Sequence, residues 1–168
     1  KRGEERVAVC AVKPNDGSDQ PVTGVVTFRQ KHGQYITIEV HLEGFKSLPS
    51  TANDTEYLHG FHVHATGNLT AGCDSTGGHY NPRNTNHGGP SDAVRHAGDF
   101  GNLRQSPDGR VDKTFTDPVA TLFGSYSIIG RGLVVHSGED DLGKGGNANS
   151  LINGNAGKRL GCCVIGSA

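Results

Sequence analysis

The chain has 168 residues and a formal net charge of −1, from 16 Lys and Arg residues against 17 Asp and Glu residues. This balance excludes the overall cationic field with which proteins attract nucleic acid or anionic membrane surfaces. No apolar run approaches the roughly 18–20 residues that span a bilayer, so no membrane segment is expected. The length predicts a single domain over residues 1–168. Glycine occupies 26 positions while methionine and tryptophan are absent, which favours short strands joined by glycine-rich turns over helices.

Short apolar segments follow one another along the chain, and they predict an all-β fold. The clearest strand covers residues 35–42, where Ile36, Ile38, Val40 and Leu42 alternate with polar residues, because period-two alternation marks a strand with one buried face. Similar runs cover residues 7–12, 22–30, 61–64, 111–116, 128–136 and 160–165. Turn-forming residues at 31–34 and 106–109 separate neighbouring runs. About eight short strands in one domain predict a β-sandwich or β-barrel.

Two segments interrupt this rhythm, residues 65–94 and 137–158, which are rich in Gly, Asn and Asp and have no apolar periodicity. Loops beyond about 12–15 residues are uncommon in compact domains unless they are functional or disordered. The first segment contains Cys73, His79 and His87, and the second directly follows His136. We therefore expect metal ions or disulfides to hold both loops.

Six histidines and one aspartate form a pattern that indicates metal binding. His62 and His64 lie two residues apart in a predicted strand, so both imidazoles project from one face and can reach the same ion. The other members follow at intervals along the chain: His79, His87, His96, Asp99 and His136. Seven ligands are too many for one four-coordinate site and one short of two separate sites, so a shared ligand is expected.

Three further histidines are left out of this site. His32 lies in a predicted turn and His41 on the polar face of a predicted strand, so both are expected to face solvent. His59 is expected to be a structural hydrogen-bonding residue rather than a ligand, although it lies close to His62.

Two segments resemble the signatures of a known family. Residues 60–64 read Gly-Phe-His-Val-His and residues 154–162 read Gly-Asn-Ala-Gly-Lys-Arg-Leu-Gly-Cys, and both resemble signatures of the copper/zinc superoxide dismutases. The resemblance covers nearly the whole chain, including residues 71–73, 79–82, 87–90, 98–102 and 136–147. It implies an all-β Greek-key barrel or sandwich of about eight antiparallel strands with two long functional loops. It also implies an oxidoreductase that dismutates superoxide to dioxygen and hydrogen peroxide in antioxidant defence.

The resemblance also implies which residues bind the copper and zinc cofactors. Copper is expected at His62, His64, His79 and His136, and zinc at His79, His87, His96 and Asp99. His79 then bridges both metals, supplies the shared ligand and carries the proton of the reaction. Asp140 matches a carboxylate that hydrogen-bonds to one ligand of each metal, here His62 and His87. Arg159 matches a cation beside copper, where a guanidinium can bind the small superoxide anion.

Four cysteines allow three disulfide pairings. The resemblance implies a disulfide between Cys73 and Cys162, which would tie the first long loop to the last strand and help to orient Arg159. Cys163 departs from the family, which usually has glycine at this position. If the chain is exported, Cys10 and Cys163 are expected to form a second disulfide.

The second long loop also departs from the family. The family commonly carries two adjacent glutamates and then a lysine that shape the field around the substrate channel, whereas Ala148, Asn149 and Ile152 occupy these positions here. Long-range attraction of the substrate should therefore depend on Arg159 and Lys144. We expect the rate to fall less steeply with ionic strength than in a relative with the full charged set.

Several features favour an extracellular location over the alternative of a cytoplasmic one. Glycosylation sequons begin at Asn53 and Asn68, the number of cysteines is even, and no methionine starts the chain, as in a processed product. The family commonly forms homodimers through an apolar patch, but Asn68 borders that interface and Ser167 replaces an often apolar residue. We therefore expect either that Asn68 is unmodified or that the subunits do not pair in the usual way.

Two other functions compete with the enzyme. A secreted metal-binding or structural protein could keep the fold without turnover, but it would not need the complete set of copper ligands together with Arg159. A copper-delivery protein related to the family normally has an additional cysteine-rich segment, for which the adjacent Cys162 and Cys163 are a poor substitute.

Overall fold

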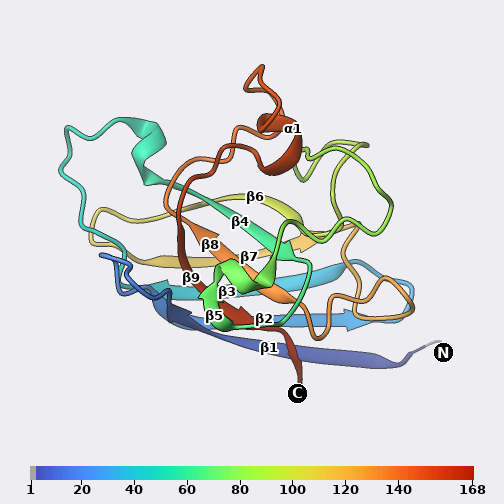
Figure 1. Cartoon of the computed structure of the whole chain (residues 1–168). Coiled ribbons are helices and arrows are strands. Elements are labelled where there is room, and N and C mark those ends of the chain that lie inside the picture. Colours follow the sequence, from blue (N-terminus) through green and yellow to red (C-terminus); the bar gives the residue numbers. More distant parts are fainter. Residues whose placement is uncertain (1–2) are drawn as a thin grey trace.

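The computed structural model, which describes residues 3–168, is built almost entirely of antiparallel strands (Figure 1). The strands are β1 Glu5–Pro14, β2 Thr23–Lys31, β3 Ile36–Glu43, β4 Leu58–His64, β5 Thr70–Cys73, β6 Asp99–Arg104, β7 Val111–Asp117, β8 Gly132–His136, β9 Arg159–Val164 and β10 Gly166–Ser167. The helical elements are single turns, η1 Asp54–Tyr57, η2 Asp74–Thr76 and α1 Ser150–Asn153. Among the described residues, no helix has the length and apolar character needed to cross a membrane.

Nine of the ten described strands, all except β5, form one curled sheet in the order β6-β4-β8-β9-β1-β2-β3-β7, with β10 paired to β1. β1 joins the two halves of the sheet, because it pairs with β2 over most of its length and with β9 only at Lys13 and Pro14. The connections from β3 to β4 and from β6 to β7 therefore cross between the halves. This nearly closed antiparallel barrel confirms the predicted all-β fold class.

The two halves of the barrel bury their side chains differently. In β3, Ile36, Ile38, Val40 and Leu42 are buried while the residues between them are half-buried or exposed, as alternation along a half-buried strand requires. In β4 and β8 nearly every residue is buried, on both faces of the strand. The two long loops lie on this side of the barrel (Figure 1), so the outer face of β4 becomes a second interior region beside the core.

The structure corrects several strand boundaries. Residues 128–131 form a turn instead of the predicted strand, because Arg131 N donates to Ile128 O at 3.1 Å and Gly130 has a φ of +87°. Strand β6 was not predicted, since its Asp99, Gly101 and neighbouring asparagine have low strand preference. Strands β5 and β10 were also missed, because four and two residues are too short to show periodicity.

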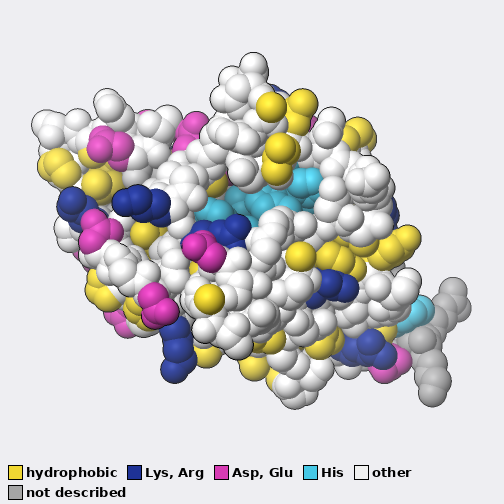
Figure 2. Space-filling model, viewed as in Figure 1, with side chains coloured by type: hydrophobic (Ala, Val, Ile, Leu, Met, Phe, Trp, Pro, Cys, Tyr) yellow, Lys and Arg dark blue, Asp and Glu magenta, His cyan; other side chains and the backbone are white. Residues whose placement is uncertain are grey.

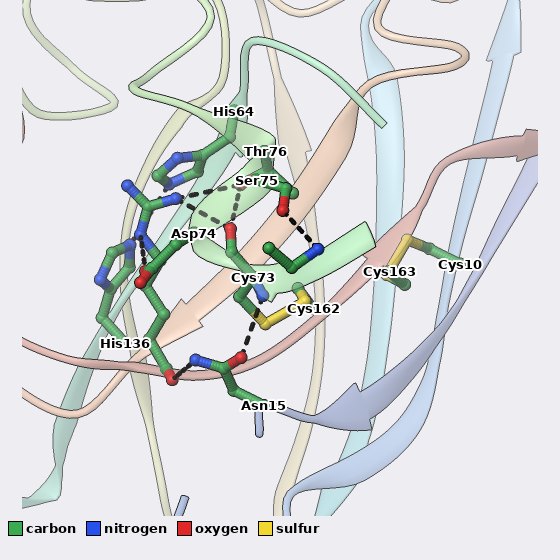
Figure 3. Close-up of a disulfide and its surroundings, with 12 residues drawn as sticks. Cys10, Asn15, His64, Cys73, Asp74, Ser75, Thr76, His136, Cys162 and Cys163 are labelled. Carbon is green, nitrogen blue, oxygen red and sulfur yellow. Dashed lines mark hydrogen bonds and ion pairs between the residues drawn. A yellow bond between two sulfur atoms is a disulfide. The ribbon is translucent and has the colours of Figure 1, made fainter. Parts of the chain in front are cut away.

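Two disulfides connect β9 to the rest of the molecule. They join Cys73 to Cys162 and Cys10 to Cys163, with Cα–Cα distances of 5.8 Å and 5.5 Å. Asn15 adds a polar clamp, since its Nδ2 donates to Arg159 O and its Oδ1 accepts from Cys73 N, both at 2.9 Å. Figure 3 shows these contacts around the beginning of the first long loop. The loop is thereby fixed against β1 and β9.

Candidate metal centre

Strands β4 and β8 place three of the predicted ligands beside one another. His62 and His64 alternate with Phe61 and Val63, which are buried in the core, so both imidazoles project to the opposite side of β4. His136 ends β8, and its Nε2 lies 3.3 Å from Nε2 of His64. The three rings therefore meet under the two long loops.

The first long loop and the turn that follows it, up to the start of β6, bring four further predicted ligands to the same place. His79 pairs with His64 through an isolated β-bridge. The backbone N–H of His87 donates to a carbonyl of α1 at 2.8 Å, which ties the two long loops together. The backbone N–H of His96 donates to Oδ2 of Asp99 at 2.7 Å, so a tight turn holds both residues at the start of β6.

The seven side chains form two overlapping clusters. In each cluster the possible donor atoms lie within 4.8 Å of one another, and the members are His62, His64, His79 and His136 in one and His62, His79, His87 and Asp99 in the other. His96 lies at the edge of the second cluster, with its Nδ1 3.1 Å from Nδ1 of His79 and 3.4 Å from Oδ1 of Asp99. His62 and His79 are both common to the two clusters, so both occupy the position that a shared ligand requires.

Buried nitrogen atoms without partners show that these clusters fit metal ions. Nδ1 of His62, Nε2 of His79 and Nδ1 of His87 are buried and make no hydrogen bond, although buried polar atoms are nearly always paired. Nδ1 of His87 lies 2.9 Å from a carboxylate oxygen of Asp99, but without hydrogen-bond geometry. Imidazole nitrogens with one carboxylate are a donor set that suits copper and zinc.

Asp140 orients one histidine of each cluster from behind. Its Oδ2 accepts from Nε2 of His62 and its Oδ1 accepts from Nε2 of His87, both at 2.7 Å, and all three side chains are fully buried. These bonds place the proton of each ring on Nε2 and leave Nδ1 free for an ion. Gly154, with a φ of +72°, passes so close to this carboxylate that a Cβ there would lie 1.9 Å from Oδ1.

Burial and hydrogen bonding set the protonation states of the ligands. Burial lowers the pKa of His62 and His64 well below the usual range, and it lowers the pKa of His136 to about 3. Burial opposes ionisation of Asp99, but hydrogen bonds from the surrounding histidines outweigh it and hold the pKa of that carboxyl well below its usual range. Burial also lowers the pKa of His87, but the hydrogen bond to Asp140 and the close carboxylate of Asp99 raise it to about 9. An ion bound there must therefore displace a proton from His87.

A cavity of about 360 Å³ opens onto the first cluster. Its wall includes His64, His79, His136 and Arg159, and Figure 2 shows histidine side chains at the bottom of a hollow on this face. Asn149 and Ile152 also line the cavity, whereas Ala148 and Lys144 are exposed outside it. Among the described residues of the wall, Arg159 is the only one with a permanent charge.

Two contacts hold the Arg159 guanidinium at this wall. Its Nη1 donates to the backbone carbonyl of Cys73 and to Oγ1 of Thr76, both at 3.0 Å. Both acceptors are buried and lie beside His64 and His136 in Figure 3. The guanidinium is thus fixed by the loop that the Cys73 disulfide anchors.

The histidines left out of the predicted site lie outside both clusters. His32 is exposed. His41 is also exposed, and its ring forms hydrogen bonds with two carboxylates on β3 and β7. His59 is buried, with Nδ1 2.9 Å from the carbonyl oxygen of His136 and Nε2 2.7 Å from Oε1 of Gln105. It supports the backbone of a ligand rather than supplying one.

Sequence reasoning missed Asn102, which holds Asp140, and Thr76, which holds Arg159 together with the expected Cys73. Oδ1 of Asn102 accepts from the backbone N–H of Asp140 at 2.7 Å, and its Nδ2 donates to the carbonyl of Asp140 at 2.9 Å. Oγ1 of Thr76 and the carbonyl oxygen of Cys73 hold Arg159 by accepting hydrogen bonds from its guanidinium. These partners lie tens of residues apart in the sequence, so no local pattern marks them.

Comparison with known proteins supports the same centre. The family model for copper/zinc superoxide dismutase (SODC) matches residues 22–165. The chain is 50% identical over 159 residues to superoxide dismutase (Cu-Zn) A of Xenopus laevis, covering 95% of this chain and 96% of the relative. It is 49% identical over 156 residues to an extracellular superoxide dismutase (Cu-Zn) of Drosophila melanogaster, covering 92% of this chain and 81% of the relative.

A third relative is the extracellular superoxide dismutase (Cu-Zn) of Rattus norvegicus. It is 46% identical over 168 residues, and the match covers 98% of this chain and 64% of the rat protein. The family match spans most of the barrel and both long loops, which are the parts that build the two histidine clusters. The chain therefore belongs to the copper/zinc superoxide dismutase family.

Proposed function

We propose that this chain, as one domain over residues 1–168, catalyses the dismutation of superoxide to dioxygen and hydrogen peroxide in antioxidant defence. The observation that carries this proposal is the pair of buried clusters sharing His79, one of which opens onto a cavity with Arg159 in its wall. Two superoxide ions and two protons give one dioxygen and one hydrogen peroxide, so the site must admit a small anion and deliver protons.

The ligand sets are assigned from the family resemblance, which places His62 with copper and His96 with zinc, whereas donor distances alone give a second cluster that contains His62 and not His96. Copper is assigned to the cluster on the cavity, formed by His62, His64, His79 and His136. Zinc is assigned to the enclosed group of His79, His87, His96 and Asp99. When bound, copper supplies the one-electron oxidation and reduction of superoxide, and zinc supplies a fixed positive charge that does not change its oxidation state.

Arg159 binds and orients the substrate in this proposal. Its Nη1 is held by two acceptors in the first long loop, which leaves the rest of the planar guanidinium available for hydrogen bonds to a small anion. No other described residue of the cavity wall carries a fixed charge. Superoxide is therefore attracted and oriented at Arg159, while neutral molecules gain nothing there.

His79 carries the proton. Its ring lines the cavity, and its Nε2 makes no hydrogen bond although it is buried. Its other nitrogen, Nδ1, lies 3.1 Å from Oδ1 of Asp99, which is held ionised and fixes the ring. A proton held at Nε2 of His79 can thus be released towards the cavity, where peroxide forms.

Catalytic turnover separates this proposal from a metal-binding scaffold with the same fold. In pulse radiolysis, the metal-loaded chain should remove superoxide in large molar excess, whereas a scaffold would consume at most a stoichiometric amount. Arg159→Gln should lower the rate by at least tenfold without loss of metal, because the anion then has no cationic partner. Stoichiometric consumption by the unaltered chain would refute the enzyme.

We also propose that the chain acts outside the cell. Some of its relatives are extracellular dismutases, two disulfides are typical of oxidising compartments, and both sequon residues, Asn53 and Asn68, are exposed. The natural protein should show four oxidised cysteines and glycan at one sequon or both by intact-mass analysis after alkylation without reductant. Free thiols and no glycan would favour the cytoplasm.

The surface near β1 and β10 bears on whether subunits pair. Val9, Leu69 and Val164 are large exposed apolar residues, and Asn68 is exposed next to one of them. We infer that either Asn68 is unmodified or the subunits do not form the usual dimer of the family. An Asn68-glycosylated sample that sediments as the ordinary dimer would refute this inference.

A further inference from the structure

Arg159 has an acidic neighbour that its positioning does not require. Nε of Arg159 lies 3.7 Å from Oδ1 of Asp74, whose side chain is 87% exposed against 21% for Arg159. Two hydrogen bonds at 3.0 Å, to Cys73 and Thr76, already fix the guanidinium. An exposed ion pair at this distance contributes little to stability. Figure 3 shows Asp74 beside the guanidinium, joined to it by this ion pair.

Two hollows meet at Arg159 and differ in charge. The inner one is the cavity over the first histidine cluster, where Arg159 is the only wall residue with a permanent charge in the described part of the chain. The outer one has a volume of about 380 Å³, and its wall holds Asp16, Asp19 and Asp74 against Lys158 and Arg159. On this side of the guanidinium, negative groups therefore outnumber positive ones.

The described wall of the inner cavity offers no second cation that could offset a carboxylate next to Arg159. Asn149 and Ile152 are uncharged and line the cavity, and Lys144 lies outside it. The attraction of an anion thus depends on one cation, and the nearest carboxylate to that cation is the paired Asp74. A unit charge within about 10 Å in water changes the local concentration of a monovalent ion by about two- to threefold.

We propose that Asp74 is a specificity-determining residue that limits the anion affinity of the site by partly neutralising Arg159. The inference rests on the proposed function, since it takes Arg159 as the group that binds superoxide. Asp74 touches neither substrate nor metal ligand and acts through the field at Arg159. Its carboxylate makes the site less attractive to abundant small anions, at the cost of a slower encounter with superoxide.

The test compares the copper- and zinc-loaded full chain with Asp74→Asn, Asp74→Glu and the matched control Glu43→Gln. Glu43 is an exposed carboxylate 3.4 Å from Arg110 at the end of β3, so the control removes the same charge from a similar pair far from the cavity. Azide, a small monovalent anion, is titrated against the visible absorption of the copper. Superoxide removal is measured by pulse radiolysis at several ionic strengths.

Asp74→Asn should lower the azide dissociation constant about two- to threefold at low ionic strength. It should raise kcat/KM for superoxide by a similar factor, and both differences should shrink at about 1 M salt, where the Debye length is about 3 Å. Asp74→Glu and Glu43→Gln should behave as the unaltered chain.

Three outcomes would overturn the proposal: no change in azide affinity with Asp74→Asn, an equal change with Glu43→Gln, or a change that persists at high salt and so reflects altered structure. The azide titration does not depend on turnover. Tighter azide binding in a chain without dismutase activity would therefore refute the proposed function and leave this inference standing.

Discussion

Oδ2 of Asp140 accepts a hydrogen bond from Nε2 of His62 at 2.7 Å, and the other oxygen of the same carboxylate accepts one from Nε2 of His87. An Asp140→Asn side chain offers one acceptor oxygen and one amide donor, so one of the two rings loses its partner. Loss of such a supporting bond typically lowers metal affinity by about 10–100-fold. Competition titrations with a chelator should show this loss for the metal held by His87 or His62.

Asp141 provides the control for this substitution. It follows Asp140 in the chain and accepts hydrogen bonds from Ser150 and Asn155, and none of its described hydrogen bonds is to a histidine ligand. Asp141→Asn should leave metal affinity within about twofold, because the neutral side chain keeps an acceptor oxygen. An equal loss in both variants would mean that loop stability, and not ring orientation, sets the affinity.

Because Arg159 is the only cation in the described cavity wall, we expect kcat/KM for superoxide to depend weakly on ionic strength. Ile152 occupies the wall of the cavity, where a lysine would add a second cation to Arg159. Ile152→Lys should therefore steepen the fall of kcat/KM with ionic strength and raise the rate at low salt. Pulse radiolysis between about 0.01 M and 0.3 M ionic strength measures both slopes. A fall in the unaltered chain as steep as in the lysine variant would contradict the account.

Removal of either disulfide should lower the stability of the chain, but removal of only one of them should also lower its activity. The Cys73–Cys162 and Cys10–Cys163 bonds close loops of 89 and 153 residues, and the chain-entropy model gives each about 4–5 kcal/mol of stability. Replacing either pair by serine should thus lower the free energy of unfolding in urea by several kcal/mol at most. Only loss of the Cys73 bond should also lower activity, by at least tenfold, because the Cys73 carbonyl holds Arg159. Equal activities in the two variants would show that Arg159 needs no such anchor.

His41 predicts a pH effect that is independent of the metals. Hydrogen bonds to Asp112 and then Glu39 raise the pKa of this exposed imidazole above 6.5. A raised folded-state pKa means that the contribution to stability is complete below pH 6.5 and is lost as the pH rises through the folded value. In a histidine NMR titration, Asp112→Asn should lower the pKa more than Glu39→Gln. The reverse order would contradict the hydrogen-bond pattern of β3 and β7.

The sequence was informative where one strand or one motif carried the signal. The alternation from Ile36 to Leu42 predicted β3 because one face of that strand is buried and the other is not. The spacing of His62 and His64 indicated a shared ion because β4 is extended. The count of seven donors indicated a shared ligand, and His79 lies in the overlap of the two clusters together with His62.

Features that depend on distant contacts could not be predicted in this way. Strand β6 has weak strand preference, and its pairing with β4 is interrupted by a register shift near His62 that no local pattern encodes. The contact of Asp74 with Arg159 joins residues 85 positions apart and exists only because the first long loop is folded back on β9. Such contacts follow from the fold as a whole.

Copper and zinc content, measured together with superoxide removal on one purified sample, tests the central claim most directly. The chain should hold about one copper and one zinc, with turnover that disappears when copper is removed and returns when copper is added back. Zinc without copper, and no activity after copper is restored, would contradict the account and leave a zinc-stabilised scaffold.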